Sequence, residues 1–424
     1  MHMPSATPIP VVVQQHADES AVLAQIRLSL SSAPHVRLHH LRRLDERLAA
    51  HLDGLVVAGG HGVRCVEAAL AEPGVGAVFA TTWLAIAHSA TDVLARLFAL
   101  AEAEPSVQPG VAGAFGWTSG ASLRGLVAQL QASPRTFARR IGIAACEAHG
   151  VDPGEALAVA IACGEDAALR AQGLGAAGRC ARTDLLGECL AALGDPDDRC
   201  RFQAARTALW LGDRHAAVEA LGGIACMPGP DLDAAVAALF KWIEPGQAAP
   251  VLKALLDSPD TLRQAVRAAG VLGDPQAVPW LIRQMDDPVL SRLAGESFSL
   301  ITGADLAALD LERAPVAGTF AGADDEAAHE DVEMDEDEGL PWPDPERVQR
   351  WWSRNAEGFV PGARYFMGAP PSWTHCVQVL RSGFQRQRIA AAEYLCLLHP
   401  GTRLFPTGAP AWRQRRWLDH LAPA

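Results

Sequence analysis

Three short motifs contain the residue types of metal, phosphate or nucleotide sites. His39 and His40 are adjacent, so on a helix they point about 100° apart and cannot share a metal ion as an i, i+4 pair can. The stretch GGHG at 59–62 follows a predicted helix instead of a strand and lacks the residues of a phosphate loop or nucleophile elbow. GLGAAG at 173–178 matches a dinucleotide-binding pattern, yet no strand precedes it. We interpret them as surface histidines, an inter-helix turn and close helix packing, and we expect no catalytic residue, cofactor or metal.

The C-terminal part of the chain concentrates Trp and Arg, the residue types that dominate protein-binding hot spots. From Leu340 onward there are eleven Arg against five Asp plus Glu, and six of the eleven Trp. The predicted partner-binding residues are Trp351, Trp352, Arg354, Arg364, Tyr365, Arg386 and Arg388. A small domain must also bury aromatic side chains to be stable, so a core role for the Trp pair stays open.

These residues must be positioned by helices, because the stretch AVRAAGVLGDPQAVPWLIRQMDDP (265–288) has helical apolar spacing on both sides of a break. Gly273 can take the left-handed conformation that ends the first helix, and Asp274 can cap the second. Pro275 fits a first helical position. Pro279 lies further into the second helix than proline usually does. We therefore expect a bend there, or a helix that starts later than Pro275.

This helical hairpin is repeated along the chain. Turn-type glycines recur every 27 to 34 residues, at Gly120, Gly150, Gly178, Gly212, Gly246, Gly273 and Gly303. The flanks agree as well, since 201–221 and 263–282 both place small residues before Leu-Gly-Asp and an apolar helix after it. With 49% hydrophobic and 6% aromatic residues, the chain is predicted to be all-α, built from two-helix repeats.

The Ala-rich first helix, the Leu-Gly-Asp turn and the second helix with Pro resemble HEAT-like repeats of the short variety first known from phycobilisome lyases. Three further stretches, LHHLRRLDERLAAHLDGLVVAG (38–59), WWSRNAEGFVPGARYFMG (351–368) and RQRIAAAEYLCLLHPGTRLF (386–405), resemble an uncharacterised bacterial family. That family is encoded in type VI secretion loci, near genes for the spike and for effector-handling proteins. The resemblance implies an α-solenoid with an accessory or adaptor role.

Four regions are expected. Residues 10–110 form an N-terminal helical region, in which a leucine stripe predicts a core helix with a charged back that includes Asp45. Residues 111–310 form the HEAT-like repeats. Residues 311–339 form an acidic flexible linker, because ten of the fifteen residues from Asp324 to Glu338 are carboxylates. Residues 340–424 form a small Trp/Arg-rich α domain.

Composition excludes several classes of protein. A net charge of -13 with only two lysines argues against a general nucleic-acid binder. No apolar run reaches the roughly 18 to 20 residues that span a bilayer, and no signal peptide is apparent, so a cytoplasmic protein is expected. The cysteines lack any Cys-x-x-Cys pair and are predicted to be reduced core residues, among them Cys146, Cys163, Cys189 and Cys226.

The favoured function is a non-enzymatic protein-binding scaffold or adaptor, accessory to type VI secretion assembly or effector loading. Its partner would be a protein client, such as a spike or effector-handling protein. The alternative is an enzyme on the same repeats, such as a DNA glycosylase in which Trp and Arg hold a nucleotide and a carboxylate assists. Arginines that recur once per repeat could also form a ladder that faces a ligand on the concave side of the solenoid. Ion pairs with nearby carboxylates are the simpler role for them.

Overall fold

The computed structural model describes residues 8–315 and 335–421, and helices are the predominant secondary structure in these ranges. Within these ranges it forms 22 α-helices joined by turns, loops and short 3-10 helices. The described residues contain no β-strand, and isolated β-bridges join Glu312 to Pro343 and Phe366 to Ala369. The all-α prediction is confirmed.

Contacts divide the chain into two units. Among the described residues, the first comprises 8–32, 36–188 and 402–421, and the second comprises 33–35, 189–315 and 335–401. This division differs from the four regions expected, because the end of the chain returns to the first unit.

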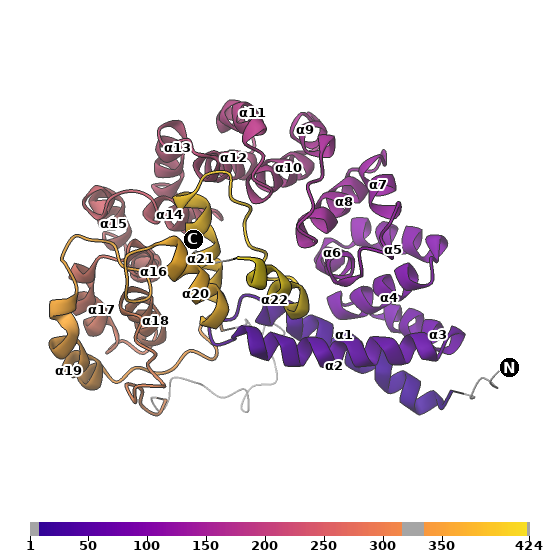
Figure 1. The fold of residues 1–424 in the computed structure, drawn as a ribbon, viewed down its shortest axis with the longest axis horizontal. Helices are drawn as coiled ribbons and strands as arrows, with labels where there is room; N and C mark the ends of the chain where they lie inside the picture. The colour runs from indigo at the N-terminus through magenta and orange to yellow at the C-terminus, as the bar shows by residue number, and fades with distance from the viewer. Residues whose placement is uncertain (1–7, 316–334, 422–424) are drawn as a thin grey trace. The chain divides into compact units, whose positions relative to one another are not determined.

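The first unit is built from two rows of helices. Its helices are α1 (Pro10–Leu30), α2 (Leu38–Val57), α3 (Gly60–Ala68), α4 (Val75–Ala87), α5 (Thr91–Ala103), α6 (Gln108–Trp117), α7 (Leu126–Gln131), α8 (Thr136–Ala148), α9 (Glu155–Ile161), α10 (Ala167–Arg179) and α22 (Ala411–His420). Helices α4, α6, α8 and α10 pack one against the next, and α5, α7 and α9 pack alongside them (Figure 1). Helix α22 packs on α2.

The second unit repeats this arrangement. Its helices are α12 (Asp198–Leu211), α13 (Ala216–Ala225), α14 (Leu232–Phe240), α15 (Ala249–Leu256), α16 (Leu262–Leu272), α17 (Val278–Gln284), α18 (Ser291–Thr302), α19 (Pro345–Asn355), α20 (Trp373–Ser382) and α21 (Gln385–Leu398), and α11 (Leu186–Ala191) spans the boundary between the units. Helices α12, α14, α16 and α18 form one row, with α13, α15 and α17 alongside (Figure 1). Helices α20 and α21 pair with each other, and α21 contacts α12.

The Leu-Gly-Asp turns form as predicted. Gly273 ends α16 in the left-handed conformation with φ 78°, and Gly212 and Gly303 end α12 and α18 in the same way. Asp274 accepts a hydrogen bond from the Gln276 amide, and α17 begins only at Val278, which confirms the later start. The glycine prediction is wrong at two positions, 178 and 246, because one lies inside α10 and the other inside a 3-10 helix.

These glycine turns are also contact points for the C-terminal part of the second unit. The Tyr365 amide donates to the Gly273 carbonyl at 2.8 Å, and the Met367 amide donates to Leu300 at 2.6 Å. A Cβ atom at Gly273 would overlap the carbonyl oxygen of Tyr365, and one at Gly303 would lie 2.6 Å from that of Met367. Glycine is required because the backbone passes so close.

Part of the segment after residue 340 shares a core with the repeats. One hydrophobic cluster joins Val266 and Phe298, on α16 and α18, to Val348, Trp352 and Tyr365. Trp352 and Tyr365, which were assigned to a separate C-terminal domain, are thus buried against α16 to α18.

The end of the acidic segment is packed, which corrects the expectation of a solvated linker there. Asp337 is 2% exposed and accepts two hydrogen bonds from Arg263, at 2.7 and 2.9 Å. Asp335 pairs with Arg292 at 2.7 Å. Each carboxylate has a guanidinium partner, which offsets the repulsion within the run. The predicted acidic residues from 324 to 334 lie outside the described residues.

The remaining sequence interpretations have mixed outcomes. His39 and His40 are exposed, and GGHG forms the start of α3. Gly173 lets α10 approach α9, because a Cβ there would lie 2.9 Å from that of Ala160. The nine cysteines all lie in the described ranges and form no disulfide. Seven are buried, but Cys226 is exposed, so its assignment to the core is wrong.

We predict that Gly273→Ala destabilises the protein, whereas Gly223→Ala does not. The first change puts a Cβ into a left-handed residue, which costs about 1–2 kcal/mol before the overlap with Tyr365 is counted. Gly223 lies exposed in α13 with nothing near its Cβ, so alanine there should gain up to about 1 kcal/mol. Thermal unfolding followed by circular dichroism compares the two variants, and equal midpoints would contradict the role given to the turn.

Candidate functional site

The predicted partner-binding residues do not form one exposed surface. Trp352, Tyr365 and Arg388 are buried, and Trp351, Arg364 and Arg386 are half-buried. Of the seven residues, Arg354 alone is exposed.

Arg364 and Tyr365 hold the second unit together. The Arg364 guanidinium donates to the carbonyls of Lys241, Trp242 and Ile243, which follow α14, and burial lowers its pKa. The Tyr365 hydroxyl accepts from the Val360 amide at 3.0 Å. Carbonyls at the end of a helix have no partner within it, so this arginine satisfies them.

Arg388 is buried and Arg386 is half-buried, whereas their predicted role in partner binding requires exposed side chains. Arg388 is 0% exposed, and its Nε donates to the Leu380 carbonyl at 2.7 Å. Desolvation lowers its pKa to about 10. Arg386 pairs with Glu296 at 2.7 Å, and burial raises the pKa of that carboxyl.

The Trp pair belongs to the core. Trp351 packs edge to face on Phe298, with ring centroids 5.6 Å apart, and Trp352 contacts Phe359 at 5.3 Å. Of the two roles considered from the sequence, packing accounts for both side chains.

A groove in the first unit gathers the tryptophans that the sequence interpretation did not single out. Its volume is about 710 Å³. We call it the tryptophan groove; it is lined by Ala49, Asp53, Trp83, Trp117, Ser119, Gly120, His149, Trp412, Arg413, Arg416, Trp417 and His420. These residues come from α2, α4, α22 and the ends of α6 and α8, so only the tertiary fold brings them together.

Asp45 positions one wall of this groove. Its carboxylate is 0% exposed and accepts from Arg27 Nε on α1 at 2.7 Å and from the Ala411 amide at 2.6 Å. The Ala411 amide is the first of α22, where amides lack helical partners and negative charge is favourable. Burial raises the pKa of Asp45, while Arg27 and the Ala411 amide act in the opposite direction. The expected charged back of α2 is thus wrong for Asp45.

Arg413 fixes α22 at a second point. Its guanidinium donates to the carbonyl of Gly116 at 2.8 Å and to that of Ala148 at 2.9 Å. These carbonyls lie at the ends of α6 and α8, and burial lowers the pKa of Arg413 to about 10. His149, beside it, donates to the Phe115 carbonyl, and its pKa is lowered by burial and by Arg413.

The open part of the groove combines aromatic and cationic groups. Trp412 is 39% exposed and meets Trp117 edge to face at 4.7 Å between ring centroids. Arg416 lines the groove, and Arg415 is its neighbour in the sequence. Both are exposed, and neither pairs with a carboxylate among the residues described. This is the composition of a protein-binding hot spot.

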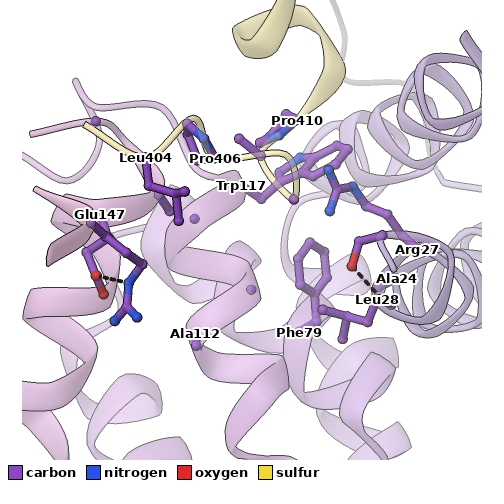
Figure 2. Close-up of a pocket in the computed structure, with 18 of the residues that line it drawn as sticks. Ala24, Arg27, Leu28, Phe79, Ala112, Trp117, Glu147, Leu404, Pro406 and Pro410 are labelled. Carbon is purple, nitrogen blue, oxygen red and sulfur yellow. Dashed lines mark hydrogen bonds and ion pairs between the residues drawn. The ribbon is translucent and has the colours of Figure 1, made fainter. Parts of the chain in front are cut away.

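A second hollow lies behind Trp117. This cavity, of about 290 Å³, is bounded by α1, α4, α6, α8 and residues 403–410. Arg27, Phe79 and Trp117 lie on one side, and Glu147, paired with Arg179, lies on the other (Figure 2). Cys180 lines it too, but burial raises the pKa of the thiol to about 12, so it is not a ready nucleophile.

The comparisons with known proteins give no match. No family model, no curated protein and no solved structure is significantly similar to this chain. Within the described ranges, every helix is too short or too polar to cross a membrane.

We predict that Arg388→Ala lowers the free energy of unfolding by about 2–4 kcal/mol, because it leaves a cavity and unpaired acceptors at Leu380 and Gln385. Arg354→Ala, which removes an exposed arginine from the same unit, should change it by less than about 0.5 kcal/mol. Urea unfolding measures both changes. An unchanged free energy of unfolding in Arg388→Ala would contradict the structural role given to this residue.

Proposed function

We propose that the protein is a non-enzymatic α-solenoid scaffold whose tryptophan groove binds an acidic segment of a protein client. The two packed rows of helices in each unit support a solenoid of the HEAT-like kind. Such stacks offer long, semi-rigid surfaces for partners.

The observation that carries the proposal is the exposed Trp412 beside Arg416 in a preformed groove. Trp and Arg supply most of the binding energy at protein interfaces, chiefly where a partner excludes water from them. Arg415 and Arg416 face solvent without a carboxylate partner in the described chain. Their charge favours an acidic client segment, which it would also steer during encounter.

The resemblance to the family of type VI secretion loci suggests where the client belongs. A spike or effector-handling protein in the cytoplasm would fit an adaptor that acts before secretion.

A DNA glycosylase is the second candidate, because the groove also places Asp53 near Trp and Arg side chains. These are the residue types that the alternative requires. The net charge of -13, with Lys241 and Lys253 as the only lysines, opposes it, since duplex DNA is held through clustered cations.

The test is selection from a displayed peptide library with the full-length protein. We expect enriched peptides that combine Asp or Glu with an aromatic or large apolar residue. The double variant Trp412→Ala, Arg416→Ala should bind a selected peptide at least about 30-fold more weakly, as expected for loss of a hot spot. Arg354→Ala is the matched control and should bind as the wild type does.

Two outcomes contradict the proposal. One is equal peptide affinity of the groove variant and the wild type, provided that both unfold at the same temperature. The other is tight binding of duplex DNA with an alkylated base, followed by base release that Asp53→Asn abolishes, which would establish the glycosylase instead.

A further inference from the structure

We propose that the cavity behind Trp117, here called the Arg27 cavity, binds a small organic acid through its carboxylate. Its apolar body would be about the size of a two-ring aromatic group. The proposal concerns a ligand site separate from client binding and does not rest on it.

The size of the cavity suits such a ligand. Its volume is about 290 Å³, and a cavity of about 150 Å³ is enough to hold benzene. Small-molecule sites begin near this volume.

The walls are mainly apolar. Leu28 from α1, Phe79 from α4 and Trp117 from α6 line one side, and Leu404 and Pro406 close another (Figure 2). Surfaces of this kind hold the apolar part of a ligand, while a few polar groups orient it.

Arg27 supplies the polar group. It is 7% exposed, and its Nε is engaged by Asp45. Its Nη2 is buried without a hydrogen-bond partner in the described chain. A buried donor that lacks a partner costs free energy, which a ligand carboxylate accepting from the outer edge of the guanidinium would recover. The same guanidinium stacks on Trp117, 5.3 Å from the ring centroid, so its orientation is fixed in advance.

The charge balance favours one negative charge on the ligand. Arg27, Arg179 and Arg403 line the cavity against a single carboxylate, Glu147. Glu147 already accepts from Arg179 and Gln172. Because Asp45 lies on the far side of Arg27, a doubly charged phosphate would meet more repulsion than a monocarboxylate.

The experiment is isothermal titration of the full-length protein with three probes. We expect 2-naphthoate to bind at one saturable site. The neutral isostere 2-naphthamide and the small carboxylate acetate should each bind at least about tenfold more weakly, because one lacks the charge and the other lacks the apolar body.

Two variants locate the site. Ala112→Phe places a ring in the cavity without touching a charge and should abolish 2-naphthoate binding, whereas the control Ala112→Ser should not. Arg27→Lys keeps a cation beside Asp45 but loses the guanidinium edge, and should weaken binding at least about tenfold. Arg96→Gln, an exposed arginine paired with Glu67, is its control. Absence of saturable binding, equal affinity for 2-naphthamide, or binding unchanged in Ala112→Phe would each overturn the proposal.

Discussion

The buried carboxylate of Asp45 is the constraint on which the first unit depends. It bonds Arg27 and the first amide of α22 at once, so a residue near the start of the chain holds a helix near its end. Burying a charge is costly unless it is paired, and breaking such a pair leaves the remaining charge stranded. The tryptophan groove needs α22 in place, and the Arg27 cavity needs the guanidinium that Asp45 orients. Both candidate sites therefore depend on this one carboxylate.

Several arginines of this protein make structural contacts inside the fold. Arg364, Arg388 and Arg413 are drawn into the fold to satisfy backbone carbonyls, chiefly at helix ends. A planar group with five donors can satisfy several carbonyls from one position, which a lysine cannot do as well. With pKa values lowered only to about 10, Arg388 and Arg413 keep their charge at neutral pH. An Arg-rich stretch is thus weak evidence for an exposed binding surface in this chain.

Local signals in the sequence were enough for the helices and several turns, because Gly273, Asp274 and Pro275 each require a particular backbone conformation. The pairing of distant segments left no such signal. Nothing near Trp352 or Tyr365 indicates that α16 and α18 bury them, and Trp117 and Trp412 meet only in the folded unit. The sequence did contain one signal, for the burial of Asp45. Asp45 is four residues after Leu41 and three before Leu48, so it lies on the apolar face of α2 and had to be buried.

Hydrogen exchange of the α22 amides tests most directly whether Asp45 builds the site. In Asp45→Asn the amides of 411–420 should exchange at least about 100-fold faster than in the wild type. Loss of the charge weakens the hydrogen bond from the Ala411 amide to residue 45, which holds the helix. Glu46→Gln, which changes the exposed neighbouring carboxylate, should leave them protected. If α22 stays equally protected in both variants, Asp45 does not hold the helix, and the dependence of the groove and the cavity on this interaction is contradicted.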